Sequence, residues 1–147
     1  EKIDDHSGIV LTNGVFDILH KGHIELLKFS KNQGDYLVVA IDSDERVRQL
    51  KGEDRPINNE EDRRKVLETN RYVDSVVTFS TAEELKSLYE TLRPNVLVKG
   101  SEWTADELRE RDSIPDTIQV KVYPLIGDYS TTNTMEKIRN MGSCEKI

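Results

Sequence analysis

Short apolar runs alternate with segments of helical periodicity along the chain, and this alternation predicts its fold class. Strand-like apolar runs occur at Ile9–Thr12, Tyr36–Ile41, Ser75–Phe79, Val96–Lys99 and Gln119–Tyr123. Between them, apolar residues recur at the spacing of one helix face, as at Leu85, Leu88, Tyr89 and Leu92. Strands that alternate with helices form βαβ units. The sequence therefore predicts an α/β, Rossmann-like, doubly wound fold, a five-stranded parallel sheet with helices on both faces.

Capping residues indicate where several helices begin. Ser80 with Glu83 predicts a capping box before the helix that carries Leu85 to Leu92. Thr104 with Glu107 predicts a second box, at the start of a shorter helix. The last helix is expected to begin at Ser130–Thr132, where hydroxyl groups and unpaired backbone N–H groups occur together.

The composition is that of a polar globular protein with 35% hydrophobic and 33% charged residues. Its 147 residues fit a single domain over residues 1–147. No apolar run approaches the length needed to cross a membrane, and a single cysteine, Cys144, favours a cytoplasmic location. The net charge of −7 argues against a nucleic-acid-binding surface. An anionic ligand would therefore need a local cluster of Lys and Arg.

Polar segments follow four of the expected strands, and open parallel sheets bind ligands at the carboxyl ends of their strands. These segments are Asn13–His23, Asp42–Asp44, Lys99–Trp103 and Gly127–Asn133. They are far apart in sequence, but the fold brings their strand ends to one edge. We therefore expect one site there.

The most informative of these segments is the first, in which two glycines are followed by His20 and His23 at a helix start. The first N–H groups of a helix lack partners and bind anions, and two imidazole donors suit a polyphosphate whose charge shifts during reaction. Asp17 in the same segment is a candidate to orient a phosphate-bound metal or the attacking group. Alternatively, it is a carboxylate that stabilises the turn.

Three basic residues further along are candidates for phosphate binding. Lys51 and Arg55 belong to a segment expected to be a mobile loop, and they could contact the β- and γ-phosphates. Arg63 shares a helix face with Val66 and Leu67, so its head group is expected to point inward to a phosphate. The alternative for Arg63 is a surface ion pair with a neighbouring carboxylate.

Trp103 is the single tryptophan, and it lies in a polar segment after a strand. It could stack on a base or ribose, although a loop aromatic often only packs against its neighbours.

Four segments together resemble the nucleotidyltransferases that carry a His-x-Gly-His motif. They are Thr12–His23, Leu50–Pro56, Leu97–Gly100 and Ser130–Asn133. The similarity is closest to the adenylyltransferase domain of bacterial heptose-phosphate enzymes. It implies that AMP passes from ATP to a sugar phosphate such as heptose 1-phosphate, and that pyrophosphate leaves. The resemblance also implies Mg²⁺ bound to the phosphates, no metal site made of side chains alone, and a homodimer in some members.

The resemblance implies a role for each matching residue. The expected catalytic residues are His20, His23, Arg63 and Lys51. The expected nucleotide-binding residues are Thr12, Asn13, Gly14, Phe16, Lys99, Gly100, Glu102, Trp103, Ser130, Thr131 and Thr132. The expected substrate-binding residues are Asp17, Asp42 and Arg55.

Two alternatives to this function are weighed against it. The glycerol-3-phosphate cytidylyltransferases are close cousins, and Leu67–Asp74 and Glu102-Trp103 look more like them. They usually carry an arginine before the last helix, however, where this chain has Leu125–Ser130 without one. The other alternative is a nucleotide-binding regulatory module without turnover, which the intact His20 and His23 disfavour.

Overall fold

The computed structural model describes residues 8–100, 103–124 and 131–141. Its five strands are β1 (Ile9–Gly14), β2 (Tyr36–Asp42), β3 (Ser75–Phe79), β4 (Val96–Gly100) and β5 (Gln119–Tyr123). All of them run parallel in one sheet of order β3-β2-β1-β4-β5. The predicted fold class is confirmed.

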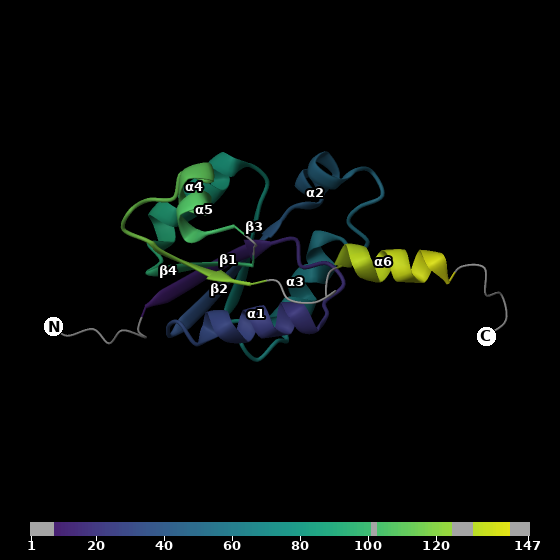
Figure 1. Cartoon of the computed structure of the whole chain (residues 1–147), viewed down its shortest axis with the longest axis horizontal. Helices are drawn as coiled ribbons and strands as arrows, with labels where there is room; N and C mark the ends of the chain where they lie inside the picture. Colours follow the sequence, from purple (N-terminus) through teal and green to yellow (C-terminus); the bar gives the residue numbers. More distant parts are fainter. Residues whose placement is uncertain (1–7, 101–102, 125–130, 142–147) are drawn as a thin grey trace.

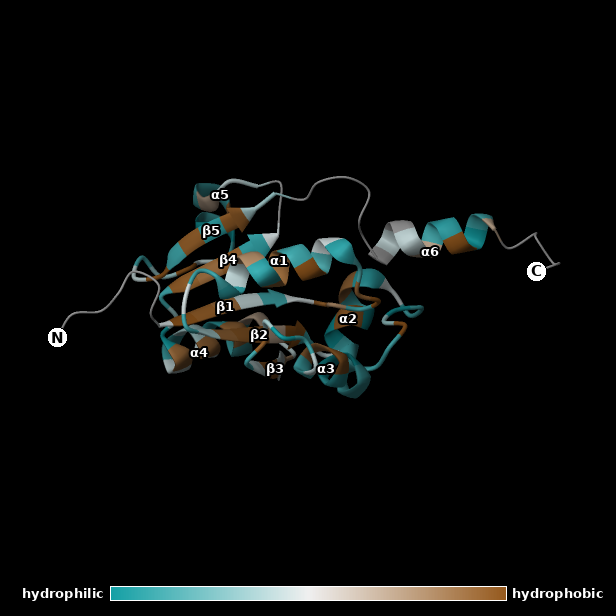
Figure 2. Ribbon diagram, turned by 90° about the horizontal axis from the view of Figure 1, so that it is seen from below, coloured by the Kyte–Doolittle hydropathy of each residue, from teal (hydrophilic) through white to brown (hydrophobic). Residues whose placement is uncertain are grey.

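Helices connect these strands and continue the chain beyond them. They are α1 (Lys21–Lys31), α2 (Asp44–Lys51), α3 (Glu60–Glu68), α4 (Ala82–Leu92), α5 (Ala105–Arg111) and α6 (Thr131–Asn140). Figure 1 shows α1 on one side of the sheet and α4 with α5 on the other. In both views, α6 lies apart from the sheet, beyond its carboxyl edge (Figures 1 and 2).

Two apolar cores, one on each face of the sheet, hold the helices. Leu26 and Leu27 of α1 and Leu67 of α3 pack with strand residues on one face. Tyr89 of α4 and Ile114, just after α5, pack on the other. Figure 2 shows the strands as the most hydrophobic segments, as expected for a sheet covered on both faces.

The position of β1 determines where a ligand can bind. β1 pairs with β2 on one side and with β4 on the other. From β1 the chain passes to α1 on one face, and from β4 it passes to α5 on the opposite face. The carboxyl ends of β1 and β4 are therefore the topological switch point, where open α/β sheets form a crevice.

Two local expectations need correction. The N-cap of α4 is Thr81, one residue later than expected: its hydroxyl accepts from Glu84 N, and the Glu84 carboxylate accepts from the N–H of Ser80, the residue before the cap. Lys51 is the last residue of α2 and not part of a loop. The box at Thr104 and Glu107 is confirmed.

Among the residues that the structure describes, no helix is long and apolar enough to span a bilayer.

Candidate active site

The two histidines of the first motif form the capping box of α1. His20 is the N-cap, and its Nδ1 accepts a hydrogen bond from Gly22 N at 3.0 Å. His23 returns the interaction, because its Nδ1 accepts from His20 N at 3.2 Å. The ring centroids lie 3.9 Å apart. The sequence prediction treated these residues only as phosphate ligands, although their spacing is that of a capping box.

This arrangement fixes the protonation state of both rings. A nitrogen that accepts from a backbone N–H carries a lone pair, so in the neutral ring the proton resides on Nε2. Burial lowers the pKa of His20, and burial together with the charge of His20 lowers the pKa of His23 to about 4, against an opposing effect of Asp17. Near neutral pH, both rings therefore present Nε2–H donors at the start of a helix.

Phe16 supports this pair from the core side. Its ring is buried and lies 5.4 Å from that of His23, centroid to centroid. The residue has a positive φ of 53°, so the turn after β1 is tight. A Cβ on Gly14 would lie 3.0 Å from the Phe16 ring, which explains the glycine there. The side chain of Phe16 serves packing, and only its backbone could face a nucleotide.

Asp17 is buried and connects the first motif to the segment before α3. Its carboxylate accepts from the backbone N–H groups of Ile18, Ile57 and Asn58, and from the Asn58 side chain. With 1% of the residue exposed, these oxygens face protein donors and not an acceptor substrate. These bonds support the turn-stabilising alternative for Asp17, and its substrate-binding role stays a prediction.

Arg63 points inward, as its periodicity predicts, but its guanidinium is bound by protein. It donates to the carbonyl oxygens of Asn58, Val15 and Asp42 at 2.9 Å each. A fourth bond, 2.8 Å long, goes to the Asp44 carboxylate. Only 1% of the side chain is exposed. Through these bonds Arg63 holds the strand ends and the segment before α3 together, and direct phosphate binding by Arg63 stays a prediction.

Two further expectations about side chains also change. Val66, expected on the buried face with Arg63, is 52% exposed, whereas Leu67 is fully buried. Thr12, expected to bind nucleotide, is fully buried, and its hydroxyl donates to Val98 O at 2.8 Å. Thr12 therefore links β1 to β4 and does not offer its side chain to a ligand.

Lys51 and Arg55 remain candidates for the leaving phosphates. Lys51 is exposed at the end of α2, whose first turn is acidic and whose last turn is basic. Within the described part of the chain, Arg55 Nε is buried without a hydrogen-bond partner. A buried donor without a hydrogen-bond partner destabilises the protein, and a hydrogen bond to a ligand oxygen would offset that cost.

A second cluster of charged residues surrounds the ends of β1 and β4. Lys99 Nζ donates to Asn13 Oδ1 at 3.1 Å and lies 3.8 Å from Asp112 Oδ2. Asp42, expected to bind substrate, forms a 2.9 Å ion pair with Arg46. The sequence prediction included Asn13, Lys99 and Asp42 but missed Arg46 and Asp112, which no motif marked.

Trp103 lies at the border of this cluster. It is 45% exposed, and the guanidinium of Arg111 lies 4.8 Å from its ring centroid. Gly100 ends β4 just before it. The expected base-stacking role of Trp103 remains a prediction.

Several predicted ligand residues cannot be placed. Glu102 and Ser130 lie outside the described residues, as does the side chain of Thr131. Thr132, in the first turn of α6, is exposed.

The described residues contain no group of three His, Cys, Asp or Glu side chains that could hold a metal ion. The carboxylate of Asp17, moreover, is occupied by backbone donors. Mg²⁺ bound to the phosphates, which the resemblance implies, stays a prediction.

Comparison with known proteins agrees with this geometry. The model of the cytidylyltransferase-like family matches residues 11–139. The bifunctional protein HldE of Alcanivorax borkumensis is 44% identical over 132 residues, 89% of this chain and 28% of that protein. HldE of Campylobacter fetus is 42% identical over 137 residues, 92% of this chain and 29% of the relative. The chain thus spans little more than a quarter of these curated relatives.

Two solved structures are also similar to this chain. The lipopolysaccharide core biosynthesis protein from Thermoplasma volcanium is 32% identical, with a TM-score of 0.65, covering 84% of this chain and 98% of that protein. Pantothenate synthetase from Thermus thermophilus superposes with a TM-score of 0.56 at 15% identity, covering 94% of this chain and 71% of the other, a likeness of fold alone. With its histidine-capped helix at the switch point, the chain belongs to the cytidylyltransferase-like family of nucleotidyltransferases.

Proposed function

We propose that this chain transfers AMP from ATP to a sugar phosphate such as heptose 1-phosphate and releases pyrophosphate. The identities of 42–44% to HldE proteins and of 32% to a lipopolysaccharide core biosynthesis protein support a sugar phosphate as acceptor. The observation that carries the transfer itself is the pair of Nε2–H donors of His20 and His23 at the start of α1.

The proposed reaction is a direct in-line displacement. An oxygen of the acceptor phosphate forms a bond to the α-phosphorus of ATP, and the bond from that phosphorus to the bridging oxygen of the β-phosphate breaks. The electron pair leaves with pyrophosphate, and Mg²⁺ bound to the phosphates would neutralise part of its charge.

The residues of the chain would act by positioning and by charge stabilisation. His20 and His23 would donate to the α-phosphate oxygens, where negative charge shifts in the transition state. Lys51 and Arg55 would bind the β- and γ-phosphates, and the buried Nε of Arg55 supports its part in this. Arg63 and Asp17 would keep the two phosphate-binding segments in place through the contacts described above.

A pyrophosphate-release assay tests the proposal, with four nucleoside triphosphates against a panel of sugar and polyol phosphates. We expect ATP to exceed CTP by about tenfold or more, the ratio that corresponds to about 1.4 kcal/mol. Equal or better turnover with CTP and glycerol 3-phosphate would assign the chain to the cytidylyltransferases instead. Absence of pyrophosphate with every pair, while nucleotide still binds, would identify a non-catalytic nucleotide-binding module.

A further inference from the structure

A cavity of about 200 Å³ lies beside the ends of β1 and β4, next to the histidine site but not part of it. Residues from β1, α2, α4, β4 and the end of α5 line it. The charged and polar side chains in its lining that matter here are Asn13, Arg46, Lys86, Lys99, Arg111 and Asp112. Nothing in the proposed chemistry so far uses the basic ones.

The lining is strongly basic in a chain whose net charge is −7. Among the described residues, the lining has four cationic side chains, Arg46, Lys86, Lys99 and Arg111, and one carboxylate, Asp112. Arg46 and Arg111 each bind a carboxylate through Nε. Those bonds leave the two terminal nitrogens of each guanidinium for other contacts. Such a concentration of charge suits a phosphorylated ligand.

Lys99 is the cation that is best placed to bind a ligand in this cavity. Its side chain is only 15% exposed, and burial lowers its pKa, partly opposed by Asp112. Within the described parts of the chain, Lys99 Nζ forms one hydrogen bond, to Asn13 Oδ1, whereas Asp112 at 3.8 Å is beyond hydrogen-bonding distance. An ammonium has three donors. By contrast, Lys31 Nζ donates at 2.8 Å to a carbonyl and at 2.6 Å to a carboxylate.

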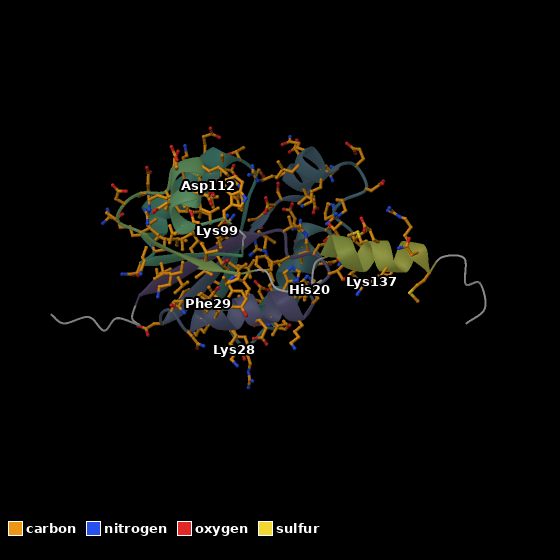
Figure 3. All side chains as sticks on the ribbon, in the orientation of Figure 1. His20, Lys28, Phe29, Lys99, Asp112 and Lys137 are labelled. Carbon is orange, nitrogen blue, oxygen red and sulfur yellow. The ribbon has the colours of Figure 1, made fainter. Side chains whose placement is uncertain are left out.

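The cavity and the histidines lie on opposite sides of the end of β1. Figure 3 shows Lys99 and Asp112 on the side of α4 and α5, and His20 at the start of α1. In an in-line displacement, the attacking oxygen and the leaving group lie on opposite sides of the α-phosphorus. The leaving phosphates are proposed to lie at Lys51 and Arg55, at the end of α2 and in the segment after it, and neither residue lines the cavity, so different residues would bind the attacking and the leaving group.

We propose that this cavity binds the acceptor, a small phosphorylated sugar or polyol, and that Lys99 positions its attacking phosphate. This inference rests on the proposed nucleotidyl transfer, and it moves Lys99 from the nucleotide to the acceptor. The cavity is smaller than the roughly 300 Å³ at which pockets for drug-sized ligands begin, so it suits such an acceptor better than a nucleotide. Asp42 contributes indirectly, because it orients Arg46.

The test uses Lys99→Met, which removes the charge at nearly constant volume, and Lys121→Met as a control from the neighbouring strand. Lys121 faces Val98 in the β4–β5 register and binds Gln33, away from the cavity. The acceptor KM is measured with heptose 1-phosphate and glucose 1-phosphate. The Kd of a non-hydrolysable ATP analogue is measured by calorimetry.

For Lys99→Met we expect the acceptor KM to rise roughly 10- to 100-fold, the scale of one charge-assisted hydrogen bond, with the nucleotide Kd within about twofold of wild type. Lys121→Met should change neither. Weaker nucleotide binding with an unchanged acceptor KM would place Lys99 at the nucleotide and overturn the proposal.

A second variant keeps the test decisive if the buried substitution impairs folding. Lys86→Met alters an exposed residue of α4 at the cavity, and we expect the acceptor KM to rise severalfold. Unchanged acceptor KM in the folded variants would overturn the cavity assignment while pyrophosphate release by wild type still supports nucleotidyl transfer. A wild-type chain that releases no pyrophosphate would reject the transfer itself, and the acceptor site with it.

Discussion

Two polar regions meet at the carboxyl edge of the sheet, and they differ in how much of their hydrogen-bonding capacity the protein already uses. Arg63 and Asp17 are almost fully buried, and protein atoms occupy their head groups. At the start of α1, backbone N–H groups occupy Nδ1 of His20 and His23, so in the neutral rings the proton resides on Nε2.

The difference shows that residue type and position alone do not assign a catalytic role. All four are charged or titratable residues near the carboxyl edge of the sheet: Asp17, His20 and His23 follow β1, and Arg63 belongs to α3. The contacts of the buried pair hold the loops together, whereas the histidine pair caps α1 through Nδ1 and carries its protons on Nε2. Variants of the first pair should mainly change stability, and variants of the second should mainly change turnover.

The largest effect is expected for Arg63→Ala. The substitution leaves the Asp44 carboxylate and three carbonyl oxygens without their donor, so we expect a loss of about 3–5 kcal/mol in the free energy of unfolding. A denaturant melt measures it. Lys65→Ala, at an exposed position of the same helix, is the matched control and should change stability by less than about 0.5 kcal/mol. A stable Arg63→Ala protein with a reduced kcat would reverse the assignment and return Arg63 to the phosphates.

Next in size is the kinetic effect at the histidines. His20→Asn keeps a good N-cap but removes the imidazole donor, so we expect kcat to fall about 10²–10³-fold with little change in melting temperature. His20→Ala should lose the same activity and about 1 kcal/mol of stability as well, because the cap is gone. Full activity of His20→Asn would show that the ring acts only as a cap.

The sequence predicted the elements and the histidine motif because both depend on local patterns. Apolar runs and capping residues predict strands and helix starts from a few neighbouring positions. Even there, two adjacent hydroxyl residues, Ser80 and Thr81, and two adjacent glutamates made the position of one cap ambiguous, and the structure has Thr81 as the N-cap.

The roles of Arg63 and Asp17 were not predictable in that way. Their partners, Val15 for Arg63 and Ile57 for Asp17, lie 48 and 40 residues away in sequence. An arginine on the inward face of a helix gives the same sequence pattern whether its guanidinium binds a phosphate or a set of carbonyl oxygens. The cavity that contains Lys99 was also missed as a unit, since it combines residues from β1, α2, α4, β4 and α5.

Stability should also depend on pH through His23. Its folded-state pKa of about 4 lies below the ordinary 6.5, so between these values the unfolded chain binds a proton that the folded chain does not. Stability is therefore complete above pH 6.5 and declines as the pH falls toward 4. At about 1.4 kcal/mol per pKa unit the ceiling is about 3.5 kcal/mol, and solvent access to the ring reduces our expectation to about 2 kcal/mol. The free energies of unfolding of wild type and His23→Gln, measured across this pH range, should diverge. Parallel curves would contradict the lowered pKa of His23.

The smallest effect is expected for Asp17→Asn, which keeps the shape of the side chain but replaces one acceptor oxygen by an amide. That amide faces the N–H group of Ile57 or of Asn58, so one buried backbone donor loses its partner, at a cost of about 1–2 kcal/mol. Since the same bonds hold the segment that follows Arg55, we expect KM for the triphosphate to rise severalfold while the acceptor KM stays constant. Asp35→Asn, a change at an exposed carboxylate near the other end of the sheet, is the control. If Asp17→Asn instead abolished turnover without loss of stability or nucleotide affinity, Asp17 would belong with the histidines as a group that acts on the reacting phosphate.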